Sequence, residues 1–106
     1  WPTSRGFDTY FGFLGCCIDK FKHSKETVVD LHNGTNAASP EYYGIFGTYL
    51  WENTARDIVE RHNVSQPLFL MVSFDAPHAV VKLPAGYNLT AEYRNATTGA
   101  SYELRK

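Results

Sequence analysis

The sequence lacks an excess of charge of either sign. Its 106 residues carry ten Lys and Arg against eleven Asp and Glu, which gives a formal net charge of -1. Nucleic-acid binding relies on a clustered excess of Lys and Arg, so this balance argues against a nucleic-acid partner. Long hydrophobic runs are also missing, and the longest covers only residues 68–72. Because a bilayer span needs ~20 apolar residues, we predict no membrane span.

Cysteine is scarce, and the two that occur are adjacent, at Cys16 and Cys17. Neighbouring Cα atoms lie ~3.8 Å apart, which is less than the ~4.4–6.8 Å that a disulfide usually spans. We therefore expect these residues either to pair with cysteines outside this chain or to remain free thiols. No second Cys pair or suitably spaced His cluster accompanies them, which argues against a zinc site.

Asparagine, by contrast, is often the first residue of a glycosylation sequon. Of six Asn residues, four head an Asn-x-Ser/Thr triplet, which is more than chance placement of Ser and Thr gives. The candidate glycosylation sites are Asn33, Asn63, Asn88 and Asn95. They predict a glycoprotein that passes through the secretory pathway.

The chain has no initiator Met, and its last residues show no sign that a fold has finished. We therefore expect it to be an internal piece of a longer protein. Hydrophobic residues make up 43% and aromatic residues 15%, which is enough apolar material for a packed core.

Hydrophobic periodicity and turn residues divide the chain into six segments. We predict an aromatic and Gly-rich loop over 1–24, a strand and turn over 26–36, an amphipathic helix over 49–62, a buried strand over 68–74, a loop over 75–87 and a polar, glycosylated segment over 88–106.

The helix and the buried strand together indicate an α/β fold. A nearly continuous apolar strand suits a parallel sheet that is covered on both faces. A helix followed by such a strand is half of a crossover unit, so the remaining strands of the sheet are expected outside this chain.

The loop after the predicted strand is the candidate site, because ligands of open α/β sheets bind outside the carboxyl ends of the strands. His78 can donate to an anionic oxygen or shuttle a proton. The alternative for His78 is a surface histidine without a part in chemistry. Asp75 is interpreted as a loop cap in preference to a catalytic group, and structural roles are favoured for Asp19 and His23.

Several segments of residues 2–87 form a series with a family resemblance. They are Pro2-Thr3-Ser4-Arg5-Gly6-Phe7-Asp8-Thr9-Tyr10-Phe11-Gly12, similar to an Arg-Gly-Phe-Asp-x-x-x-Gly segment; Asp19 and His23; Thr48-Tyr49-Leu50-Trp51 with the helix after it; Pro67-Leu68-Phe69-Leu70; and Pro77-His78 with Pro84 and Tyr87, similar to a His-x5-Pro-x2-Tyr loop. In this order they resemble the sulfatases, specifically the arylsulfatase B type.

The resemblance implies an alkaline-phosphatase-like domain with a mainly parallel central sheet, of which residues 1–106 are an internal part. It implies a calcium-dependent sulfuric ester hydrolase, lysosomal or secreted, that acts on sulfated small molecules or glycosaminoglycans. The nucleophile would be a formylglycine made from the Cys of a Cys-x-Pro-Ser-Arg motif, which neither Cys16 nor Cys17 heads. The formylglycine and the calcium ligands are therefore expected outside this chain.

The catalytic residue that the resemblance assigns to this chain is His78, which matches a histidine that binds the sulfate ester and assists the leaving oxygen. No metal ligand is expected here, and the 106 residues alone are predicted to be inactive. Two alternatives remain for the whole protein: a catalytically inactive sulfatase-like glycoprotein with a binding or storage role, and a related phosphoesterase with a Ser or Thr nucleophile.

Overall fold

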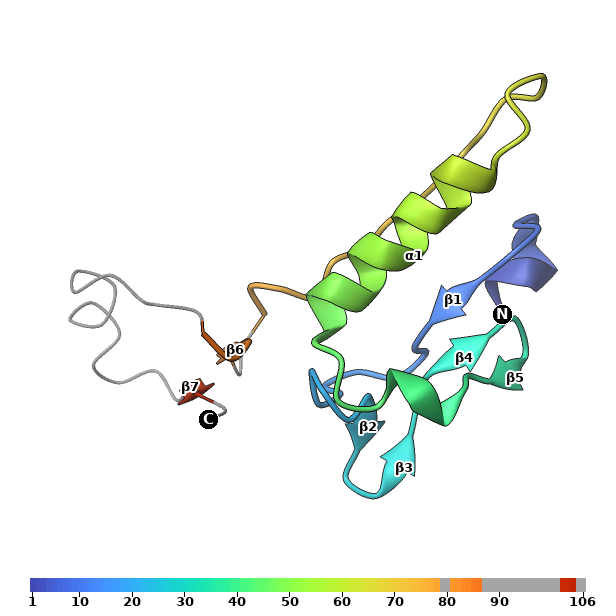
Figure 1. The fold of residues 1–106 in the computed structure, drawn as a ribbon. Coiled ribbons are helices and arrows are strands. Elements are labelled where there is room, and N and C mark those ends of the chain that lie inside the picture. Colours follow the sequence, from blue (N-terminus) through green and yellow to red (C-terminus); the bar gives the residue numbers. More distant parts are fainter. Residues whose placement is uncertain (79–80, 87–101, 105–106) are drawn as a thin grey trace. The chain divides into compact units, whose positions relative to one another are not determined.

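The computed structural model describes residues 1–78, 81–86 and 102–104, and the chain divides into two units, Trp1–Phe74 and Asp75–Lys106. Short elements dominate the first unit, which has one α-helix (Figure 1). Its elements are η1 (Pro2–Arg5), β1 (Phe11–Gly12), β2 (Ser24–Lys25), β3 (Val28–Val29), β4 (His32–Asn33), β5 (Asn36–Ala37), η2 (Pro40–Tyr42) and α1 (Gly47–Arg61). The described part of the second unit contains β6 (Val81–Leu83) and β7 (Tyr102–Leu104).

The strands of the first unit form two small antiparallel sheets. β4 lies between β1 and β5, and β2 pairs with β3. Strands of two residues supply few ladder hydrogen bonds, so side-chain packing has to stabilise their arrangement. The loop predicted over 1–24 is largely present as a loop, although it also contains η1 and β1.

The strand predicted over 26–36 is broken into two. β3 ends at Val29 and β4 begins at His32, and the two strands belong to different sheets. The break falls at Asp30, whose carboxylate accepts hydrogen bonds from the backbone of residues 14 and 15. This contact between distant parts of the chain overrides the local β propensity.

The dipeptide Asn33-Gly34 predicts a two-residue hairpin turn, and the structure has the turn one residue later. Asn33 pairs with Asn36, so Gly34 and Thr35 form a two-residue hairpin loop between β4 and β5. Gly34 has a φ of 60°, a left-handed conformation that glycine adopts at little cost.

In the second unit, β6 and β7 are parallel, with Val81 opposite Tyr102 and Leu83 opposite Leu104. β6 lies within the loop predicted over 75–87, and β7 lies within 88–106, which the sequence predicts to be a polar, glycosylated segment. The rest of that segment lies outside the described residues. The mainly parallel central sheet of the whole protein stays a prediction.

The helix predicted over 49–62 is found at Gly47–Arg61. Its first turns carry the buried residues Leu50 and Trp51, whereas Val59 near its end is 56% exposed. Ion pairs at i,i+4 spacing, Arg56 with Glu52 and Arg61 with Asp57, lie on its exposed surface. The buried side of α1 is therefore confined to its amino-terminal half.

The core of the first unit forms where α1 meets the first sheet. Leu31, Leu50 and Trp51 are buried, and the half-buried side chains of Phe11, Phe13, Ala38 and Tyr42 pack against them. The ring centroid of Trp51 lies 6.0 Å from that of Phe11 and 5.9 Å from that of Phe13. Aromatic rings at such distances add favourable edge and face contacts to the burial of apolar surface.

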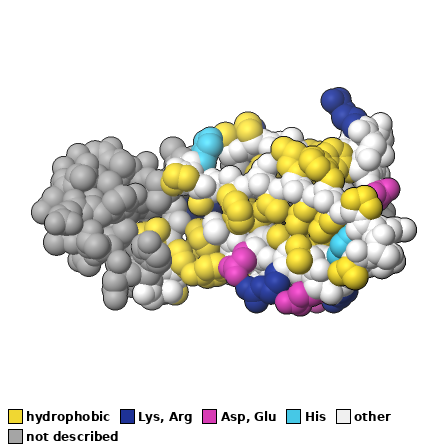
Figure 2. Space-filling view, turned by 90° about the horizontal axis from the view of Figure 1, so that it is seen from above, with side chains coloured by type: hydrophobic (Ala, Val, Ile, Leu, Met, Phe, Trp, Pro, Cys, Tyr) yellow, Lys and Arg dark blue, Asp and Glu magenta, His cyan; other side chains and the backbone are white. Residues whose placement is uncertain are grey.

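The buried strand predicted over 68–74 is not formed by this chain on its own, and it stays a prediction for the whole protein. The segment has no strand pairing, and Phe69, Met71 and Phe74 are 78%, 67% and 53% exposed. A strand forms only where a neighbour accepts and donates its ladder hydrogen bonds, and the described residues supply no such neighbour. Figure 2 shows hydrophobic side chains gathered on one face of the described part of the chain.

We expect the Trp51→Ala substitution to lower the free energy of unfolding of the chain by about 3–5 kcal/mol, because it empties the centre of the core. Denaturation by urea, followed by far-ultraviolet circular dichroism, measures the change. The exposed Glu60→Ala variant on the same helix serves as the control, with an expected change within about 0.5 kcal/mol. Equal effects of the two substitutions would contradict the assigned core.

Candidate functional site

His78, the predicted catalytic residue, lies at the end of a tight turn. Its backbone N–H donates to the carbonyl oxygen of Asp75 at 3.1 Å, and the Ala76–Pro77 peptide bond within the turn is cis. The side chain of His78 is exposed, and that of Asp75 is half-buried. The imidazole is therefore accessible to a ligand, and its catalytic role stays a prediction.

Asp19 and His23 have the structural roles that the sequence favoured. The Asp19 carboxylate accepts the backbone N–H groups of Phe21 and Lys22 at 2.8 and 2.7 Å, which caps the turn between these residues. His23 is 1% exposed, and its Nε2 lies 3.1 Å from the carbonyl oxygen of Tyr42. A carbonyl oxygen only accepts, so Nε2 carries the proton. Buried in this way, His23 does not meet a ligand from solvent.

Asp30, a carboxylate bonded to residues far from it in the sequence, was not a candidate in the sequence analysis. Its Oδ1 accepts the N–H of Leu14 at 3.1 Å, and its Oδ2 accepts the N–H of Gly15 at 2.6 Å. Nε2 of His32 lies 2.9 Å from Oδ1 and forms an ion pair with it when the ring is protonated. No sequence signal joins Asp30 to residues 14 and 15. They are 16 and 15 positions away from it, with no periodic pattern between them.

The surroundings of Asp30 favour its charged form. Partial burial raises the pKa of the carboxyl, but the N–H donors of Gly15 and Leu14 and the His32 ring outweigh burial, so the pKa is lowered. Gly15 is required for this arrangement, because a Cβ at that position would lie 2.8 Å from Oδ2 of Asp30. The site has the character of a structural clamp between the 14–15 loop and β4.

Cys16 and Cys17 are exposed and do not form a disulfide with each other. Their side chains contact, and the hydrogen bond with Cys16 raises the pKa of the Cys17 thiol. A raised pKa keeps more of the thiol protonated at neutral pH and so lowers its reactivity as a nucleophile. Pairing of either cysteine with one outside the chain stays a prediction.

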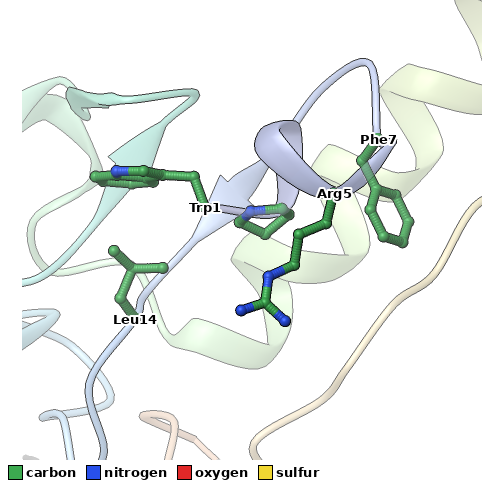
Figure 3. A pocket seen from close by; sticks show the side chains of 5 residues that line it. Trp1, Arg5, Phe7 and Leu14 are labelled. Carbon is green, nitrogen blue, oxygen red and sulfur yellow. The ribbon is translucent and has the colours of Figure 1, made fainter.

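A hollow of about 320 Å³ opens near the start of the chain and is lined by Trp1, Pro2, Arg5, Phe7 and Leu14. Figure 3 shows the Arg5 side chain projecting between Trp1 and Phe7. The lining combines aromatic rings with one guanidinium, and a guanidinium can pair with an anionic group. In the sequence, Arg5 and Phe7 stand out only as parts of the 2–12 motif, and the aromatic residues around the arginine are the signal for the hollow. The hollow belongs to the first unit and His78 to the second.

The described residues do not provide a calcium site. Among them, no three His, Cys, Asp or Glu side chains lie close enough together to hold a metal ion. Each carboxylate oxygen of Asp30 accepts a backbone N–H, so N–H donors occupy the positions that a cation would need. The calcium ligands expected outside this chain stay a prediction.

The sequons lie in two different settings. Asn33 is exposed in β4, and Asn63 is exposed in the turn that follows α1. Asn88 and Asn95 lie outside the described residues. In the part of the chain that the structure describes, no helix is long and apolar enough to cross a membrane.

Comparison of the sequence with known proteins indicates a family relationship. No protein-family model and no solved structure matches the chain. The chain is, however, 35% identical over 91 residues, 81% of its length, to a curated protein of Mus musculus. This similarity relates the chain to the sulfatases. The relative is named arylsulfatase J, and the chain spans 15% of its length. It supports the family resemblance seen in the sequence but not the arylsulfatase B type.

The contact between Gly15 and Asp30 predicts a coupled pair of substitutions. Gly15→Ala should lower the free energy of unfolding by about 1–3 kcal/mol, because the new methyl group displaces a carboxylate that three donors hold. In the Asp30→Ala background the same substitution should cost little. Urea denaturation of the wild type, both single variants and the double variant measures the coupling energy. A cost of Gly15→Ala that is the same in both backgrounds would exclude the contact.

The lowered pKa of Asp30 predicts an acid-dependent loss of stability. Because the pKa is lower in the folded than in the unfolded chain, the stabilisation is complete above the ordinary value of 3.8 and is lost as the pH falls through the folded value. The wild type should therefore lose more of its free energy of unfolding on acidification than Asp30→Asn does. Denaturation at a series of pH values compares the two, and parallel curves would contradict the assignment.

Proposed function

We propose that the protein to which this chain belongs hydrolyses sulfate esters. The observation that supports this proposal is the 35% identity to an arylsulfatase over 81% of the chain. The order of the matching sequence segments agrees with it. Because the chain spans 15% of the relative, the activity is a property of the whole protein, and the 106 residues alone are expected to be inactive.

His78 is the residue of this chain that we assign to the reaction. It stands on the loop that follows the apolar segment 67–74, its side chain is exposed, and its backbone is tied to Asp75 through the turn. An imidazole so placed can donate a hydrogen bond to a sulfuryl oxygen and a proton to the leaving alcohol. This assistance lowers the charge that develops on the leaving oxygen in the transition state.

The remaining machinery is proposed to lie outside the chain. Cys16 and Cys17 do not head the Cys-x-Pro-Ser-Arg motif from which formylglycine is made, and the raised pKa of Cys17 does not favour a nucleophile. The described residues hold no calcium site. We therefore assign the formylglycine, the calcium ligands and the groups that bind the sulfate to other parts of the protein.

The finer features of the proposal rest on the sequence. The arylsulfatase B type, and with it a sulfated sugar as the substrate, is supported by the series of motifs from 2–12 to His78. A lysosomal or secreted location is supported by the four sequons. An alkaline-phosphatase-like domain would provide the neighbours that the apolar segment 67–74 lacks in this chain.

In the full-length protein, His78→Ala should lower kcat for an aryl sulfate by ~10²-fold or more, because the leaving oxygen loses its proton donor. Two substrates sharpen the measurement: one with a good phenol leaving group and one with a poorer alcohol leaving group. The loss should be larger for the poorer leaving group, since it depends more on protonation. His62→Ala, a histidine variant at the end of α1, is the matched control and should leave kcat unchanged.

An unchanged kcat in the His78→Ala variant would remove the assigned role while leaving the sulfatase activity itself in place. The activity is tested separately by the mass of the peptide that carries the Cys-x-Pro-Ser-Arg motif. Conversion of its cysteine to formylglycine supports a sulfatase. A protein without this motif, or without turnover of any sulfate ester, would contradict the proposal.

A further inference from the structure

The turn after α1 presents a sequon to solvent. α1 ends at Arg61, and Asn63, Val64 and Ser65 follow in a turn that is closed by the N–H of Gln66, which donates to the carbonyl oxygen of Asn63 at 3.0 Å. Val64 is 95% exposed, and Asn63 and Ser65 are exposed on either side of it. In Figure 1 this turn lies at the end of α1 that is remote from β2 and β3.

Within this turn, the side chain of Asn63 is bonded to its own sequon. Oγ of Ser65 donates to Oδ1 of Asn63 at 2.9 Å, and the backbone N–H of Ser65 donates to the same oxygen at 3.1 Å. The backbone N–H is only a donor, so the oxygen and the nitrogen of the carboxamide are assigned without ambiguity. Both bonds are made by Oδ1, so Nδ2 of Asn63 takes no part in them.

The second described sequon differs in this respect. Asn33 is also exposed, but it lies in β4, where its backbone is paired with Phe11 on one side and Asn36 on the other. Among the described residues, the hydroxyl of Thr35 makes no hydrogen bond to the Asn33 carboxamide. Exposure therefore does not distinguish the two asparagines, whereas the hydroxyl contact does.

We propose that Asn63 is an N-glycosylation site and that it is a better acceptor than Asn33. In the reaction, Nδ2 of Asn63 displaces the pyrophosphate from C1 of a lipid-pyrophosphate-linked oligosaccharide. An N–C bond forms, the C–O bond to the pyrophosphate breaks, and the lipid pyrophosphate leaves. A base of the transferase takes one proton from the amide nitrogen. The Ser65 hydroxyl binds the amide oxygen during this exchange, which gives a physical role to the third residue of the sequon.

The experiment uses the full-length protein expressed in a mammalian cell and recovered from the culture medium or the lysosomes. The protein is digested with a protease, and the peptides are treated with peptide-N-glycosidase in ¹⁸O-labelled water. This step removes each glycan and converts its Asn to labelled Asp, so mass spectrometry gives the occupancy of each site. We expect a larger labelled fraction at Asn63 than at Asn33. An unlabelled Asn63, an occupancy at Asn33 equal to or above that at Asn63, or a protein that never enters the secretory pathway would each overturn the proposal.

Variants of the turn separate the hydroxyl contact from the asparagine itself. Asn63→Gln and Ser65→Ala should each abolish labelling at this site, whereas Ser65→Thr, which keeps the hydroxyl, should retain it. Asn33→Gln is the matched control and should leave the labelling at Asn63 unchanged. Retained labelling in Ser65→Ala would overturn the assigned part of the hydroxyl. All of these readouts are independent of sulfate ester hydrolysis, so they stand or fall separately from the proposed function.

Discussion

The packing of Trp51 is the contact on which the first unit depends. Its strands are two residues long, so their ladders do not account for the arrangement. Trp51 reaches from α1 to Phe11 in β1 and to the ring of His23, with centroid distances of 6.0 and 6.3 Å. One buried indole thus joins the helix to both the first sheet and the turn that Asp19 caps. Because aromatic burial is worth several kcal/mol, a single side chain can hold segments that lack extended backbone pairing.

The sequence predicts those elements that depend on interactions between residues close together in the chain. It does not predict those that depend on contacts between distant residues. The start of α1 is predicted to within two residues because hydrophobic periodicity is a local pattern. The strand over 26–36 was predicted in one piece because β propensity is also read locally. The strand is interrupted at Asp30, whose carboxylate accepts the N–H groups of residues 14 and 15. No local sequence pattern predicts such a contact. The same reason explains why the Asp30 clamp and the hollow around Arg5 were missed.

The apolar segment 67–74 shows the opposite case, in which the residues indicate more order than this chain supplies. Its composition is typical of a strand covered on both faces, yet Phe69 is 78% exposed and the backbone is unpaired. A strand is defined by its neighbours, so the sequence of one strand predicts its burial but not the partners that produce it. The candidate site depends on the same partners. His78 lies on an accessible loop, and the catalytic role predicted for it depends on groups that we expect outside this chain.

The roles proposed for Asn63 and His78 together constrain the direction in which segment 67–74 runs within the whole protein. Asn63 precedes the segment, and His78 follows it. If the segment becomes a strand of eight residues, these ends are separated by roughly 26 Å at ~3.3 Å per residue. A glycan needs solvent at one end, and a sulfate ester needs a shielded pocket at the other. Both needs are met when the strand runs from the surface turn after α1 toward the carboxyl edge of the sheet, where open α/β sheets bind their ligands. A glycan found on Asn63 would therefore also argue that the turn after α1 is not covered by the rest of the protein.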